Sequence, residues 1–160
     1  MRFKPGHSAS RQEGEPCFWM VFYKDKLLVN TSDKTVKLPL TSHPLIPAGA
    51  APSRELYLGE LDGYPCIAAE TASDENSPAD MAFIGLRRLY FIDEDLFRLA
   101  GRASQMIKWD RTHQYCGQCG TKTLSKSDEP ARVCLACGLS AYPRISPAVM
   151  AAVPTMSGAL

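Results

Sequence analysis

Four of the six cysteines in this chain form two matching pairs. Cys116 and Cys119 make the first pair, Cys134 and Cys137 make the second, and two residues separate the cysteines of each pair. Two short Cys-x-x-Cys loops that turn their sulfurs to one side are typical of a tetrahedral four-thiolate zinc site. Four thiolates would occupy every position around the ion, so we expect structural zinc and no open position for a catalytic water.

Two other uses of the same four cysteines stay open from the sequence. Two disulfides would require an oxidising compartment, for which no feature of the chain argues, and an iron site of the rubredoxin kind would use the same ligands. Glycine supports the metal interpretation, because Gly120 and Gly138 follow the second cysteine of each pair and Gly117 follows the first cysteine of the first pair. Glycine tolerates positive φ, which lets backbone amides fold back toward the thiolates.

An amphipathic helix is expected over residues 96–113, and it leads directly into the first cysteine pair. The acidic run Asp93–Asp95 favours a helix start, since acidic side chains complement the positive end of the helix dipole. The arginines of this helix are expected on its solvated face, and Trp109 in the core or at an interface. Apolar side chains recur at helical spacing at Leu96, Leu99, Ala100, Ala103, Met106 and Ile107.

The residues before the helix carry strand signals. Aromatic and β-branched residues on both sides of a short polar break predict a hairpin over 18–30. A second hairpin is predicted over 55–70, where Asp62 and Gly63 supply the turn, and residues 81–92 are expected to be extended.

These elements predict an α+β protein with a β-rich N-terminal domain, one amphipathic helix and then a four-cysteine zinc ribbon. The expected divisions are a flexible arm (1–16), the β-rich domain (17–95), the connecting helix (96–113), the ribbon (114–142) and a tail (143–160).

Composition narrows the class of protein. A net charge of +1 argues against a generally basic nucleic-acid surface. Residues 1–16 contain no apolar core of the length that a signal peptide needs, and the apolar run Cys17–Tyr23 is far too short to span a bilayer. We therefore expect no membrane partner and a cytoplasmic protein. Cys17 and Cys66 lie in predicted strands and are expected to be buried free thiols.

A series of motifs through the helix and ribbon resembles the NADH pyrophosphatase family of Nudix hydrolases. The resemblance implies a homodimeric enzyme that hydrolyses the pyrophosphate of NAD(H) to nicotinamide mononucleotide and AMP, and in some members removes NAD caps from RNA. It also implies a β-rich N-terminal domain, a ribbon and a C-terminal Nudix domain, in that order. The motifs are Phe97-Arg-Leu-Ala-Gly-Arg102, Trp109-Asp-Arg-Thr-His113, Tyr115-Cys-Gly-Gln-Cys-Gly120, Val133-Cys-Leu-Ala-Cys-Gly138 and Tyr142-Pro-Arg-Ile-Ser-Pro147.

Three substrate contacts follow from the resemblance, at Arg87, Glu129 and Tyr142. Their residue types suit the roles, because arginine binds phosphate or carboxylate, tyrosine stacks on a ring and glutamate accepts ribose or amide hydrogen bonds. Without the resemblance, they would be a surface arginine, a solvated loop glutamate and a core tyrosine.

The sequence departs from the family at the catalytic box. The glutamate-rich Nudix box, which holds the divalent ions that polarise pyrophosphate, is absent, and no Asp or Glu follows Glu129. Mg²⁺ or Mn²⁺ would therefore belong only to the missing Nudix domain. Residues 145–153 match the opening strand of that domain. We expect a truncated NAD(H) pyrophosphatase that is inactive alone.

The alternative is a free-standing zinc-ribbon module that binds a protein or nucleic acid. Between Lys108 and Arg144 there are six Lys or Arg and three Asp or Glu, a difference of +3. Four thiolates with one Zn²⁺ add about −2, which leaves about +1, too little for strong phosphate-driven binding. Nucleic acid is therefore not expected as a partner, except as NAD-capped RNA in the parent enzyme.

Overall fold

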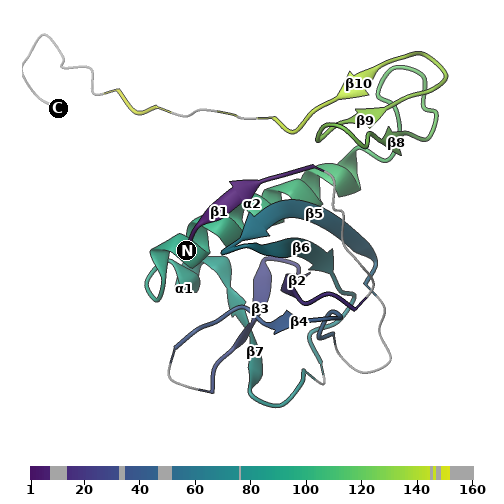
Figure 1. The fold of residues 1–160 in the computed structure, drawn as a ribbon. Helices are drawn as coiled ribbons and strands as arrows, with labels where there is room; N and C mark the ends of the chain where they lie inside the picture. The colour runs from purple at the N-terminus through teal and green to yellow at the C-terminus, as the bar shows by residue number, and fades with distance from the viewer. Residues whose placement is uncertain are drawn as a thin grey trace, which may run out of the picture.

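The computed structural model describes residues 1–7, 14–32, 35–46, 52–75, 77–144, 146 and 149–151. Figure 1 shows a long helix that lies along an N-terminal sheet and ends at a second, smaller sheet. The strands are β1 (Phe3–Pro5), β2 (Cys17–Tyr23), β3 (Lys26–Asn30), β4 (Leu40–Thr41), β5 (Arg54–Leu61), β6 (Tyr64–Glu70), β7 (Met81–Gly85), β8 (Leu124–Ser125), β9 (Arg132–Val133) and β10 (Ser140–Ala141). The helices are α1 (Leu86–Leu89) and α2 (Glu94–Thr112).

The N-terminal sheet joins the two predicted hairpins. Its seven strands follow the order β1-β5-β6-β2-β3-β7, with β4 paired to β2 outside this path. β2 pairs with β3 and β5 pairs with β6, so both hairpins are confirmed. The second turns at Asp62 and Gly63, whose φ angles of 50° and 88° are those that a tight two-residue hairpin requires. A parallel pairing of β2 with β6 joins the hairpins at the centre of the sheet.

Both faces of the central strands are buried. Along β2, Trp19 and Val21 point to one face while Met20 and Phe22 point to the other, as the two-residue period of a strand requires. The face with Met20 packs against α2, and the other face packs against loop residues such as Leu45. The two cysteines outside the ribbon, Cys17 and Cys66, are fully buried, as predicted, and burial raises the pKa of Cys66 to about 12.

The chain before β2 differs from the expected flexible arm. Phe3–Pro5 forms β1 and pairs with the edge of the sheet at β5. β5 has an irregular register between Tyr57 and Gly59, and this irregularity lets Leu58 and Leu61 both enter the core although they are three residues apart. The arm expectation is therefore wrong for these residues, because backbone pairing at a sheet edge needs no apolar sequence pattern.

The helical region is confirmed over most of its length, with one correction. Asp93 caps α2, since its Oδ1 accepts a hydrogen bond of 2.9 Å from the amide of Leu96. Residues 81–92 are not extended throughout, because β7 ends at Gly85 and α1 follows. Leu89 of α1 is fully buried in the same core cluster as Leu96, so the chain turns to fill the core.

The C-terminal sheet completes the predicted α+β architecture. It is a three-stranded antiparallel sheet in the order β10-β9-β8, reached directly from the end of α2. The Nudix-strand match at 145–153 lies largely outside the described residues. In the described part of the chain, no helix is both long and apolar enough to cross a membrane.

Candidate metal centre and its surroundings

The four predicted ligands converge on one point. The sulfurs of Cys116, Cys119, Cys134 and Cys137 all lie within 4.8 Å of one another. Three of the S···S distances are 3.5 Å for Cys116 to Cys137, 3.4 Å for Cys119 to Cys134 and 3.6 Å for Cys119 to Cys137. Zinc with four bonds of about 2.3 Å would set sulfurs about 3.8 Å apart, so the donor set fits this ion.

Backbone hydrogen bonds close both loops in the same way. The amide of Gly120 donates to the carbonyl of Cys116 at 2.9 Å, and the amide of Gly138 donates to Cys134 at 2.8 Å. Both glycines have positive φ, 73° and 77°, whereas Gly117 does not. The glycine after each pair is therefore the position that the turn requires, and the two half-sites are geometrically equivalent.

The cysteines are available to a metal, because all four are free thiols with no disulfide between them. Hydrogen bonds with the side chain and backbone of Thr121 lower the pKa of Cys119 to about 6, whereas the sulfurs of the other three cysteines raise the pKa of Cys137 to about 12 despite a hydrogen bond from the backbone of Leu139. A thiol must lose its proton to bind zinc, so zinc binding would release protons from this cluster. Four thiolates leave no position for water, so the arrangement supports a structural ion.

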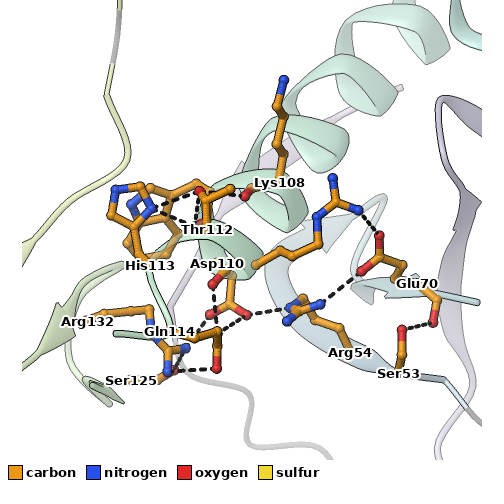
Figure 2. A network of polar contacts seen from close by, with 12 residues as sticks. Ser53, Arg54, Glu70, Lys108, Asp110, Thr112, His113, Gln114, Ser125 and Arg132 are labelled. Carbon is orange, nitrogen blue, oxygen red and sulfur yellow. Dashed lines mark hydrogen bonds and ion pairs between the residues drawn. The ribbon is translucent and has the colours of Figure 1, made fainter. Parts of the chain in front are cut away.

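A buried carboxylate, Asp110, connects the ribbon to α2 and to the sheet. Asp110 Oδ1 accepts a hydrogen bond of 2.5 Å from Arg132 of β9, and Oδ2 accepts one of 2.6 Å from Arg54 of β5. The side chains of Asp110 and Arg132 are only 7% and 8% exposed. Figure 2 shows Arg132 and Arg54 approaching Asp110 from opposite sides. The carboxylate is therefore shared between the two sheets.

Other polar groups complete this network. Arg132 also donates to the hydroxyl and the carbonyl of Thr123, at 2.8 and 2.9 Å, and Gln114 donates to Asp110 Oδ2 at 3.0 Å. On the sheet side, Glu70 accepts from Arg54 at 2.9 Å and from Arg111 at 2.6 Å. These bonds pair the guanidinium groups of Arg54 and Arg132 with carboxylates and hold the ribbon against the N-terminal domain.

Sequence reasoning missed this network. Arg54 and Arg132 lie 56 and 22 residues from Asp110 along the chain, and no local spacing rule relates residues so far apart. The sequence held one weak indication that Asp110 is buried. It falls seven residues after Ala103 and three after Ile107, which places it on the apolar side of the helix. A carboxylate there requires a cationic partner.

Two of the three expected substrate contacts lie together in the ribbon. The hydroxyl of Tyr142 donates to Glu129 Oε1 at 3.1 Å, and Lys126 donates to the same oxygen. The Lys126 ammonium and the Tyr142 hydroxyl lower the pKa of Glu129, so its carboxylate is ionised. Glu129 lines a hollow of about 230 Å³ between β5, α2 and the ribbon loop, with Trp109 on its wall.

Arg87 lies elsewhere. It is exposed on α1, which packs near the start of α2, whereas Glu129 and Tyr142 lie beyond the end of α2. The 19 residues of α2 span about 28 Å at the usual helical rise, so one copy of the chain does not bring Arg87 to the other two.

Two family models match consecutive parts of the chain. One describes an NADH pyrophosphatase-like rudimentary NUDIX domain and matches residues 16–109. The other describes an NADH pyrophosphatase zinc ribbon domain and matches residues 111–142. The second match covers all four clustered cysteines.

Curated relatives give the same result. The chain is 35% identical over 125 residues to the NAD-capped RNA hydrolase NudC of Deinococcus radiodurans, a match that covers 76% of this chain and 44% of the relative. It is 36% identical over 124 residues to the protein of the same name from Stutzerimonas stutzeri, covering 75% of this chain and 39% of the relative. The chain thus spans less than half the length of these relatives.

Proposed function

Because this chain belongs to the NADH pyrophosphatase family of Nudix hydrolases, we propose that it supplies the N-terminal domain and zinc ribbon of an enzyme that hydrolyses NAD(H). Water would cleave the pyrophosphate to give nicotinamide mononucleotide and AMP. The carboxylates that hold Mg²⁺ or Mn²⁺ for this step would belong to a Nudix domain outside these 160 residues. The 160 residues by themselves would be inactive.

The hydrogen bond between Tyr142 and Glu129 carries this proposal. It holds a partly exposed aromatic ring beside an ionised carboxylate, at the edge of a hollow. A ring of this kind stacks on a nicotinamide or adenine base, and a carboxylate accepts hydrogen bonds from ribose hydroxyls or an amide. These are the groups that NAD(H) presents on either side of its pyrophosphate.

The third contact, Arg87, would act from a second copy of the chain. The length of α2 separates it from Glu129 within one protomer, while a homodimer could place the α1 end of one copy against the ribbon of the other. Arg87 would then bind a phosphate or carboxylate of the substrate. Sedimentation of the zinc-loaded protein would have to show a dimer for this contact to stand.

Hydrolysis assays test the proposal in two steps. The zinc-loaded chain, incubated with NADH and Mg²⁺, should release no AMP by chromatography. A chimera that joins this chain after Arg144 to the C-terminal remainder of the Deinococcus radiodurans relative should release AMP. In the chimera, Glu129→Gln should lower kcat/KM for NADH by about tenfold, the value of one hydrogen bond to a charged group.

Asp128 provides the matched control, because it is an exposed acid next to Glu129. Asp128→Asn should leave kcat/KM within about twofold of the parent chimera. AMP release by the chain alone would contradict its proposed inactivity. If the Glu129→Gln chimera were fully active, Glu129 would not be a substrate contact. A well-folded but inactive chimera would favour the alternative, a free-standing binding module.

A further inference from the structure

The four clustered cysteines are not equally open to solvent. Cys116 and Cys134, which begin the two pairs, are buried, with 6% and 0% of their surface exposed. Cys119 and Cys137, which end the two pairs, are exposed. The two half-sites therefore share one pattern, a buried first cysteine and an exposed second one.

The two exposed cysteines are neighbours across the half-sites. The sulfurs of Cys119 and Cys137 lie 3.6 Å apart, and a disulfide bond is about 2.05 Å long, so the two atoms need to approach by only about 1.5 Å. Every residue of 117–122 and of 135–139 is exposed, so no packed side chain holds either cysteine in place. These two sulfurs are therefore free to meet.

The two buried cysteines are anchored instead. The amide of Cys116 donates to the carbonyl of Thr121 at 2.8 Å, and the amide of Cys134 donates to the carbonyl of Leu139 at 2.9 Å. Cys134 also directly follows β9, where Arg132 is tied to Asp110. Although Cys134 lies nearer to Cys119, at 3.4 Å, its burial and its anchored backbone make it the less available partner.

The structure assigns Cys119 and Cys137 as an oxidation site, at which a hydroperoxide joins the two sulfurs in a disulfide and so detaches the ribbon from the N-terminal domain. Exposed thiolates are the cysteines that hydroperoxides oxidise, and a second thiolate close by converts the first product to a disulfide. The assignment concerns residues that would also hold zinc, and it turns on which of the four reacts.

The reaction consumes one hydroperoxide. The Cys119 thiolate attacks the terminal oxygen, the O–O bond breaks, and the leaving alkoxide takes a proton to become an alcohol, or water when the oxidant is hydrogen peroxide. Cys119 is then a sulfenic acid. The Cys137 thiolate attacks its sulfur, the S–S bond forms, and the leaving hydroxide takes a second proton to become water. Two sulfurs are oxidised, and the two oxygens of the hydroperoxide are reduced.

The disulfide leaves the ribbon without its support. Cys116 and Cys134 alone supply two of the four ligands that a structural zinc site requires. The ribbon strands are two residues each, so they depend on the metal for their folding free energy. When β9 loses its order, Arg132 no longer reaches Asp110, and the bonds between the two sheets are broken.

This inference rests on the proposed function at one point, the effect on substrate binding. Glu129 lies between the two cysteine pairs and Tyr142 follows the second pair, so the ribbon is what holds them together. Oxidation should separate them. Because a disulfide is reversibly reduced by thiols, reduction in the presence of zinc should restore the contact.

Mass spectrometry of the unaltered, zinc-loaded chain tests which cysteines react. After treatment with hydrogen peroxide, free thiols are blocked with N-ethylmaleimide in denaturant, and a colorimetric chelator measures the released zinc. We expect one disulfide, between Cys119 and Cys137, and one zinc released for each disulfide formed, with maleimide on Cys116 and Cys134. A disulfide through Cys116 or Cys134, or zinc release without a disulfide, would overturn the assignment.

Histidine variants test whether the exposed pair is responsible. Three cysteines and one histidine also bind structural zinc, so Cys119→His should hold one zinc and keep it at the peroxide dose that empties the unaltered chain. Cys116→His is the matched control, because it retains both exposed cysteines and should still lose its zinc. Equal zinc loss from Cys119→His would overturn the assignment, and the disulfide map of the unaltered chain decides the question if a variant fails to bind zinc.

NMR spectra report the structural consequence. In the oxidised chain, amide signals of 114–142 should collapse while those of β2 and β6 remain dispersed, and dithiothreitol with zinc should restore the ribbon signals. Dispersed ribbon signals in the fully oxidised chain would show that the disulfide does not detach the ribbon.

This inference and the proposed function fail in different ways. If the chimera hydrolyses NADH but the Cys119–Cys137 disulfide does not form, only the oxidation site is wrong. If the disulfide forms and zinc is released as described but the untreated chimera is inactive, the proposed function is wrong and the oxidation site stands.

Discussion

At the scale of single residues, Asp110 decides how the ribbon is attached. It is the one acidic side chain that α2 buries. An isolated buried carboxylate would be strongly unfavourable, and two arginines from different sheets make it acceptable. Removing one charge from this buried ion-pair network lowers the free energy of unfolding by more than the intact network adds to it, because the remaining charges stay buried without a partner.

Replacing the Asp110 carboxylate should therefore destabilise the protein strongly. Asp110→Asn keeps the size of the side chain but leaves Arg132 and Arg54 without their anion, and we expect the free energy of unfolding to fall by about 3 kcal/mol. Urea denaturation at neutral pH measures the change.

The control is the exposed pair of Arg98 and Glu94, whose side chains are 71% and 55% exposed. Arg98→Gln should change the free energy of unfolding by less than about 0.5 kcal/mol. A similar small effect for Asp110→Asn would mean that the network is not important for stability.

At the scale of elements, β1 depends on one glycine in β5. Gly59 has φ of +136°, and a Cβ built there would lie 2.1 Å from the carbonyl oxygen of Lys4 and 2.9 Å from Cα of Pro5. Both contacts are with backbone, so neither can be relieved by rotation of a side chain. Only glycine permits β1 to pair at this position.

Gly59→Ala should consequently displace β1 and lower the free energy of unfolding by more than about 2 kcal/mol. Gly101 in α2 offers the matched control, since a Cβ there meets nothing within 4 Å. Gly101→Ala should raise stability by about 0.8 kcal/mol, because alanine is the better helix former. Thermal denaturation compares the two, and amide exchange at Lys4 and Gly6 reports loss of β1. A Gly59→Ala protein with protected β1 amides would contradict this account.

At the scale of the whole molecule, the chain is one fold with two different sources of stability. The N-terminal sheet and α2 share a large apolar core. The ribbon strands are two residues each and bury few side chains, so the metal must provide most of the free energy that folds them.

Zinc removal should therefore unfold only one part of the molecule. A strong chelator, or Cys134→Ser, should abolish the ribbon while the N-terminal sheet persists. In NMR spectra, amide signals of 114–142 should collapse while those of β2 and β6 remain dispersed. The N-terminal domain should lose stability as well, because Arg132 no longer reaches Asp110. Cys17→Ser provides a control outside the metal site that should keep one zinc per chain.

A ribbon that kept dispersed signals after complete zinc removal would contradict this division. So would loss of the whole sheet in Cys134→Ser, because that result would place both parts in one cooperative unit.

The sequence by itself determined the features that depend on local spacing. The two cysteine pairs, the Asp62-Gly63 turn, the amphipathic helix with its acidic start and the first hairpin all depend on residues within a few positions of one another. The structure confirms each of them.

Only the tertiary structure decided what depends on residues far apart. β1 pairs through backbone groups with β5, more than fifty residues away along the chain, and Asp110 meets its arginines across two sheets. Arg87 lies at the opposite end of α2 from Glu129, and two acids of the charge count, Asp110 and Glu129, are held in ion pairs with Arg132, Arg54 and Lys126. Charge and hydrogen bonding act through space, so their balance at a surface can be read only once the chain is folded.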